Sequence, residues 1–147
     1  MDKMSELMRK PRAMKQLLLA SLVILLIGCN PVEQTENKES SEMLGEEVFD
    51  NNCVVCHGSQ GRGLVSNWKV KGADGNYPAP PLNGTAHTWH HSPAQLLYTI
   101  NKGGVEMGGQ MPAFEKRLTE EEKKALIDYM YSLWPKEIQE KYDERFK

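Results

Sequence analysis

The sequence predicts an all-α protein of three to five helices connected by large loops. Three observations support this fold class: apolar residues recur at helical spacing, no segment alternates with the period of two that is typical of strands, and there are no internal repeats. The chain has 147 residues, of which 39% are hydrophobic and 26% are charged. This composition is that of an ordinary folded domain and excludes a fully disordered chain.

The N-terminal segment has the pattern of a secretory signal. Basic residues at positions 3–15 precede an apolar run from Leu17 to Ile27, which is shorter than the ~18 residues of a membrane-spanning helix. The end of the run, Leu26-Ile27-Gly28-Cys29, resembles the lipobox of bacterial lipoproteins, which implies cleavage before Cys29 and attachment of lipid to its sulfur. The alternative is an uncleaved N-terminal anchor. The lipoprotein and the anchored protein would both lie at the extracytoplasmic face of a bacterial membrane, in the periplasm or at the cell surface.

Composition divides the chain into four parts. Residues 1–28 are the expected lipoprotein signal peptide, and residues 29–42 are the lipidated cysteine and a polar stretch that buries too little surface to fold, so we expect a flexible tether. Residues 43–135 form the folded domain, and residues 136–147 are expected to form a short amphipathic tail helix. Loss of the basic signal leaves a mildly acidic chain, which argues against nucleic-acid binding.

Three helices are predicted within the folded domain, at residues 43–53, 92–103 and 119–134. Ser92 is expected to cap the second of these helices, with Pro93 at its first position. Thr119 and Glu122 have the spacing of a capping box, and apolar residues after them form one stripe. These three segments therefore supply the core of the predicted fold.

Residues 58–88 separate the first two helices and are rich in Gly, Pro and Asn, without a sustained period. So long a loop is uncommon in a folded domain unless something other than helices and strands organises it. A bound cofactor would supply that organisation.

Cys53-Val54-Val55-Cys56-His57 is the segment that carries chemistry. Two cysteines three residues apart, followed at once by histidine, form the attachment signature of c-type haem, in which both thiols add to vinyl groups and the imidazole binds the iron. The sequence therefore predicts one covalently bound haem c.

Three alternatives for this segment are weaker. A zinc site needs four ligands, and only His87, His90 and His91 remain as partners, at no usual spacing. A thioredoxin-like pair needs a βαβ context, which is missing. A structural disulfide between the two cysteines would explain neither the adjacent histidine nor the long loop.

An electron-transfer haem with six-coordinate iron needs a second axial ligand, and a thioether stabilises the reduced iron. We expect this ligand to be Met111, because Pro112 holds it in an extended conformation within a glycine-bounded loop. The alternatives are a ligand role for Met107, a core-filling role for Met111, and ligation by His87, His90 or His91.

Several motifs between Met43 and Trp134 match the pattern of one protein family when they are taken together. They are Gly45 and Phe49 with Leu126 and Tyr129, the Cys53 to His57 signature with Gly58 and Gly61, Pro80-Pro81-Leu82, and Met111-Pro112-Ala113-Phe114. Together they resemble the class I, monohaem cytochrome c family, with residues 43–135 as the cytochrome c domain. The resemblance implies the cytochrome c fold, a hydrogen bond from the His57 imidazole to the Pro80 carbonyl, and His57 and Met111 as iron ligands. The long loop between Gly63 and Pro80, the paired histidines and the tail depart from the family pattern.

The expected function is single-electron transfer by a membrane-tethered protein that has no catalytic activity of its own. Its partners are expected to be redox proteins of the respiratory chain or an extracytoplasmic enzyme. One alternative is a haem-based sensor or enzyme of small molecules, in which Met111 is a labile ligand and His90 and His91 are distal acid–base groups. Another is a fixed haem subunit of a larger oxidase or dehydrogenase complex.

Overall fold

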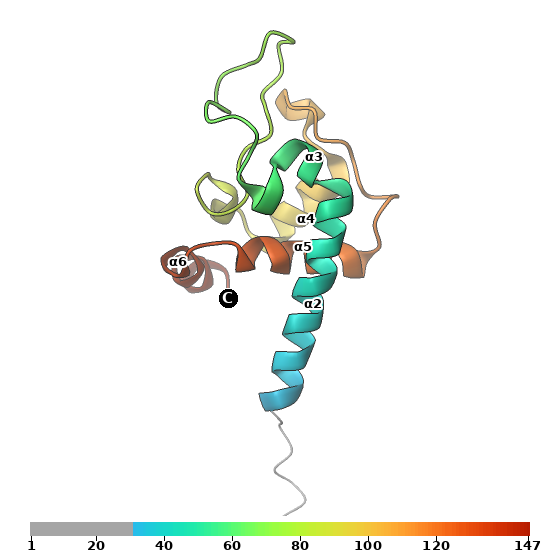
Figure 1. The fold of residues 1–147 in the computed structure, drawn as a ribbon, viewed down its shortest axis with the longest axis vertical. Helices are drawn as coiled ribbons and strands as arrows, with labels where there is room; N and C mark the ends of the chain where they lie inside the picture. The colour runs from blue at the N-terminus through green and yellow to red at the C-terminus, as the bar shows by residue number, and fades with distance from the viewer. Residues whose placement is uncertain (1–30) are drawn as a thin grey trace, which may run out of the picture. The chain divides into compact units, whose positions relative to one another are not determined.

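The computed structural model describes residues 31–147, and their secondary structure is entirely helical (Figure 1). The α-helices of this part of the chain are α2 (Pro31–Asn52), α3 (Val54–His57), α4 (Pro93–Lys102), α5 (Glu120–Ser132) and α6 (Lys136–Phe146). Three 3₁₀ turns join them: η2 (Ser59–Gly61), η3 (Thr88–His90) and η4 (Val105–Met107). The predicted all-α fold is confirmed. The signal peptide and the lipobox with Cys29 lie outside the described residues.

Helix α2 is longer than expected, because it includes residues 31–42, for which the sequence predicts a flexible tether. The side chains of residues 35–40 are exposed, as expected of a polar stretch. Extending a helix that is already nucleated adds one hydrogen bond for each residue fixed, so a polar segment can remain helical without burying a face. Lys38 and Glu42, one helical turn apart, form an ion pair in which Nζ lies 3.5 Å from the carboxylate oxygen. Ser41 Oγ donates to the carboxylate of Asp128 in α5 at 2.8 Å.

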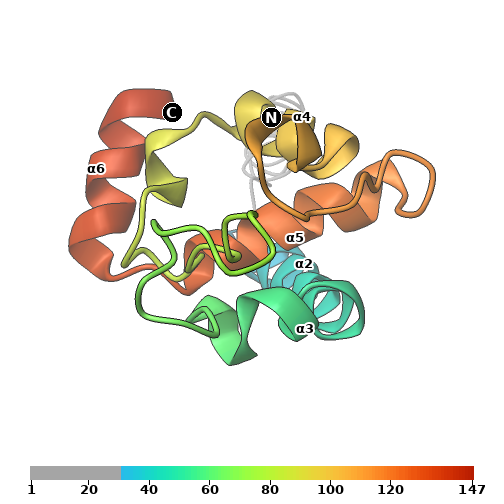
Figure 2. The same ribbon diagram turned by 90° about the horizontal axis from the view of Figure 1, so that it is seen from above.

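Helix α5 crosses α2 at close range (Figures 1 and 2). The approach depends on Gly45, since a Cβ atom built there would lie 2.7 Å from Cβ of Tyr129 and 2.6 Å from the carbonyl carbon of Ala125. One turn further along α2, the fully buried Phe49 packs its ring 5.5 Å from that of Tyr129. The core around this crossing contains Val48, Phe49, Cys53, Ile100, Phe114, Leu118, Leu126, Tyr129 and Met130.

Helices α4 and α5 begin with the predicted capping boxes. Ser92 Oγ accepts from the backbone N–H of Gln95 at 3.3 Å, and Thr119 Oγ1 accepts from that of Glu122 at 3.2 Å. The two helices are also joined by Lys123, which is 1% exposed and donates from Nζ to the side-chain oxygen of Asn101 at 2.9 Å. A buried ammonium group must be paired to be tolerated, and Lys123 also contacts the carboxylate of Glu120.

Helix α6 lies in the segment for which the sequence predicts an amphipathic tail helix. Its Tyr142 is buried, and the ring centre lies 4.8 Å from that of Trp134 and 4.9 Å from that of Phe146. Tyr131 of α5 donates from its hydroxyl to Asp143 at 2.9 Å. The tail is therefore packed against the end of α5. Within the described residues, no helix is both long enough and apolar enough to span a membrane.

We predict that Gly45→Ala destabilises the domain by about 2 kcal/mol, because the new methyl group would overlap α5. At a helical position with free space around it, replacing glycine by alanine would instead stabilise the fold by about 1 kcal/mol. The sign of the change in the free energy of unfolding therefore shows whether α2 and α5 are in close contact at Gly45. Urea unfolding followed by far-UV circular dichroism measures it. Glu47→Ala, at an exposed position of α2, is the control and should change the free energy of unfolding by less than about 0.5 kcal/mol. A raised midpoint for Gly45→Ala would contradict the packing described here.

Candidate haem-binding site

Helix α3 brings both thiols and the imidazole of the attachment signature into one turn. The backbone N–H groups of Cys56 and His57 donate to the carbonyl of Cys53 at 3.1 and 2.9 Å. Cys53 is buried in the core, Cys56 is exposed, and both are free thiols. Burial, with the neighbouring Cys56, raises the pKa of Cys53 to about 11, so its thiol stays protonated. The structure does not join the two cysteines in the disulfide considered as an alternative.

His57 is held in one orientation by the loop that follows. It is 7% exposed, and its Nδ1 donates to the carbonyl of Pro80 at 2.8 Å, as the cytochrome c resemblance implies. Because a carbonyl oxygen only accepts, Nδ1 carries the proton and Nε2 is left as the atom with a free lone pair. Burial lowers the pKa of His57, and the bond to Pro80 opposes this only in part. The imidazole is thus kept neutral, as a metal ligand must be.

The proline loop that orients His57 accepts hydrogen bonds at three successive carbonyls, and the second and third of these fix the loop to other parts of the chain. The carbonyl of Pro80 accepts from His57, that of Pro81 accepts from the hydroxyl of Thr88 at 3.3 Å, and that of Leu82 accepts from Trp134 Nε1 at 2.8 Å. Sequence reasoning missed the last two contacts. A buried tryptophan needs an acceptor for its N–H, but the sequence does not indicate which one.

Met111 lies on a different segment, between α4 and α5. It is partly buried and packs against the core, and its carbonyl accepts from the N–H of Gly104 at 2.9 Å. Three residues further on, Phe114 is buried and its N–H donates to the carbonyl of Ile100 at 2.9 Å. Met107, by contrast, is 65% exposed on η4. The two methionines therefore differ in burial, since Met111 packs against the core and Met107 does not.

The three histidines of the preceding loop pack against aromatic rings. His87 stacks on Trp68 with ring centres 5.2 Å apart and meets His91 edge-on at 5.4 Å, while His90 meets Trp89 edge-on at 3.9 Å. Desolvation, followed by the nearby charges of His91, His90 and Lys69, lowers the pKa of His87. None of these ring contacts is with Met111.

The residues of the site fit a covalently attached haem. Two free thiols precede a buried neutral imidazole, and its Nε2 has no hydrogen-bond partner among the described residues. The chain also turns sharply after the signature, where Gly58 and Gly61 have φ of +70° and +64°, conformations that favour glycine. Within residues 35–147, no three His, Cys, Asp or Glu side chains are gathered as ligands for a metal ion, so the zinc alternative has no ligand set there.

Comparisons with known proteins agree with this site. The chain is 35% identical to the Cbb3-type cytochrome c oxidase subunit CcoP of Azospirillum sp. (strain B510) over 89 residues, which cover 60% of this chain and 27% of that protein. It is 27% identical to cytochrome c6 of Chlorolobion braunii over 99 residues, which cover 63% of this chain and 91% of that protein. No solved structure matches at the same level of significance.

A further relative is the cytochrome c subunit of alcohol dehydrogenase (quinone) from Gluconobacter oxydans (strain 621H), 26% identical over 105 residues, which cover 67% of this chain and 20% of that protein. The chain thus spans only about a quarter of the length of the oxidase subunit and still less of the dehydrogenase subunit. The family described as "Cytochrome C oxidase, cbb3-type, subunit III" matches residues 41–130, which include α3, the proline loop and Met111. Because that match covers most of the chain, the protein belongs to this family, and its cytochrome c domain is an electron carrier with haem c as its cofactor.

Proposed function

We propose that this chain carries single electrons between protein redox partners at the extracytoplasmic face of a bacterial membrane. Cys53 and Cys56 would hold the haem covalently, and His57 and Met111 would be its axial ligands. The observation that carries this proposal is the buried His57 imidazole, donating to Pro80 at 2.8 Å beside two free thiols. Bound haem c supplies an iron that takes up and releases one electron.

The surroundings of His57 and Met111 support transfer rather than catalysis. His57 is fixed through Nδ1 to a loop that is anchored at two further carbonyls, so the orientation of the imidazole is restrained. Met111 is backed by the core and by a backbone bond to Gly104. His90 and His91, the acid–base groups of the sensor or enzyme alternative, are engaged with other aromatic rings. No observation favours that alternative.

A second candidate, a fixed haem subunit of a larger complex, is favoured by the comparisons. Two of the relatives are named as subunits of an oxidase and of a dehydrogenase. The match to cytochrome c6, on the other hand, spans 91% of that protein. Membranes solubilised in a mild detergent and fractionated by size distinguish the candidates, because a carrier would elute alone and a subunit would elute with an oxidase or dehydrogenase activity.

Covalent attachment is tested by acid–acetone extraction of protein matured together with the haem-attachment machinery. We predict that the wild-type polypeptide retains all of its colour, since thioether bonds survive the extraction. Cys53→Ser and Cys56→Ser should each retain one bond, and the double substitution should release the haem completely. Free extraction of haem from the wild type would contradict the proposal.

The axial role of Met111 is tested by the spectrum of the ferric protein. We predict a low-spin spectrum with the weak red charge-transfer band of sulfur–iron coordination. Met111→Ala should abolish the band, open a site for carbon monoxide or cyanide, and lower the reduction potential, because the preference of the thioether for ferrous iron is lost. Met107→Ala is the matched control and should leave the spectrum unchanged. Loss of the band only on substitution of His90 or His91 would show that a different loop supplies the ligand.

Membrane attachment through Cys29 is tested by fractionation and mass spectrometry. We predict that the mature protein begins at a lipidated Cys29, and that Cys29→Ser leaves it either unprocessed or released from membranes. A diacylated cysteine suffices for this attachment, because two acyl chains anchor stably where one binds only marginally. A wild-type protein with residues 1–28 intact and the cysteine unmodified would overturn the lipoprotein assignment.

A further inference from the structure

The long loop between α3 and the proline loop is tied to the loop that carries Met111. We call residues 67–77 the strap and residues 103–111 the distal loop. The backbone N–H of Tyr77, at the end of the strap, donates to the carbonyl of Gly108 at 3.0 Å. The Tyr77 ring covers the same residue, since a Cβ atom built on Gly108 would lie 3.6 Å from it. Gln110, next to Met111, donates from Nε2 to the carboxylate of Asp74.

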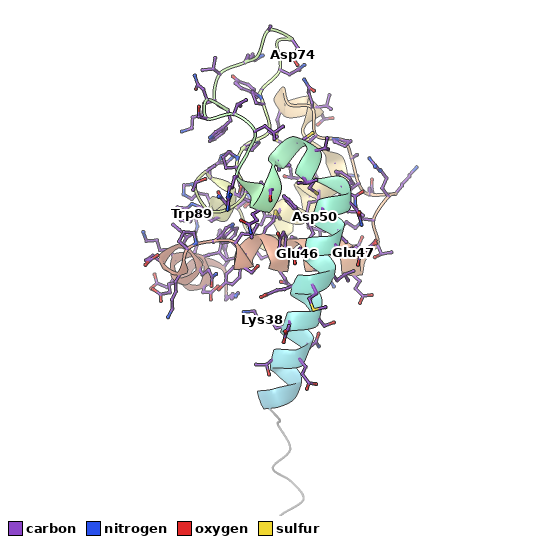
Figure 3. The ribbon with its side chains drawn as sticks, viewed as in Figure 1. Lys38, Glu46, Glu47, Asp50, Asp74 and Trp89 are labelled. Atoms are coloured by element: carbon purple, nitrogen blue, oxygen red, sulfur yellow. The ribbon has the colours of Figure 1, made fainter. Side chains whose placement is uncertain are left out.

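The strap is ordered by its own hydrogen bonds. The N–H of Gly72 donates to the carbonyl of Asn76 at 2.9 Å, and the N–H of Gly75 donates to the carbonyl of Gly72 at 3.0 Å. Asp74, labelled near the outer tip of the strap in Figure 3, accepts from the N–H of Asn76 at 3.1 Å. The strap therefore meets the distal loop as a preformed turn, so that less conformational entropy is lost in the contact.

The distal loop is closed by backbone hydrogen bonds and buries little side-chain surface of its own. It contains four glycines, each of which gains conformational freedom on opening, and Gly108 has φ of +78°. Its one ordered turn, η4, exposes 68% of Val105 and 65% of Met107. Backbone bonds from Gly104 to Met111 and from Gly109 to Gly104 close its base. Segments with so little burial open locally at low free energy, so contacts at the tip set how often this loop opens.

We propose that the strap is a positioning device for the second axial ligand, in which Tyr77 and the Asp74–Gln110 pair keep the distal loop closed and so keep Met111 on the iron. The inference rests on the proposed function, because it requires Met111 to be that ligand. Loosening the strap leaves the ligand in place on average but raises the frequency of its detachment. The strap thereby limits how quickly a small external molecule reaches the iron.

The test is the rate at which imidazole, at saturating concentration, replaces the sulfur in the ferric holoprotein. Tyr77→Ala removes the ring over Gly108, and we expect the rate to rise roughly tenfold. Gln110→Ala removes the exposed hydrogen bond to the Asp74 carboxylate, which contributes less stability than the Tyr77 contact. We expect the rate of imidazole binding to rise about threefold in this variant. Hydrogen exchange of the amides of residues 108–111 should accelerate in both variants, which provides a readout independent of the iron.

Two matched controls accompany these variants. Tyr77→Phe keeps the ring and the backbone N–H and should behave as the wild type, and it tests the ring contact even if Tyr77→Ala does not fold. Glu106→Gln changes an exposed side chain of η4, away from the strap contacts, and should leave both the imidazole rate and the hydrogen exchange unchanged.

The outcomes separate this inference from the proposed function. If the wild type shows the sulfur–iron band but Tyr77→Ala and Gln110→Ala bind imidazole and exchange amides at the wild-type rate, the strap has no positioning role and the inference is overturned. Equal acceleration in Glu106→Gln would also overturn it. If the wild type lacks the band, Met111 ligation itself is wrong, and this inference is overturned with it.

Discussion

The carbonyl of Pro80 accepts a hydrogen bond from Nδ1 of His57. This bond keeps the proton on Nδ1 and leaves Nε2 as the nitrogen that can bind a metal. The bond is only as rigid as the proline loop, and the loop is held from elements distant in the sequence. Trp134, two residues after α5, donates from Nε1 to the carbonyl of Leu82, and the buried Tyr142 of α6 packs against Trp134. The C-terminal tail therefore supports the orientation of the His57 imidazole, which lies far from it in the sequence.

Much of this arrangement could be predicted because it depends on short-range chemistry. A capping box requires only the right residues three positions apart, and Ser92 and Thr119 begin their helices as predicted. The close helix crossing follows from Gly45 and an aromatic residue one turn later, a pattern that the cytochrome c resemblance already implies. The hydrogen bond between His57 and Pro80 was predicted on the same resemblance.

Other features could not be predicted because they depend on which distant groups meet. Residues 31–42 are helical because they continue a packed helix, although their composition alone favours a tether. Lys123 is expected to be exposed from its residue type, yet it is buried because Asn101 of α4 supplies an acceptor. The contact of Tyr77 with Gly108 joins two loops without periodicity, so no sequence pattern indicates that they touch.

The crossing of α2 and α5 also determines when Cys53 can be buried during folding. Cys53 belongs to the same core as Leu126 and Tyr129, so it cannot be buried until the last of the core helices has been made. Non-local contacts of this kind form late, because the intervening chain must first be closed into a loop. A chain in which α5 has not yet packed against α2 therefore leaves the Cys53 side chain accessible, whereas Cys56 remains exposed in the folded domain as well.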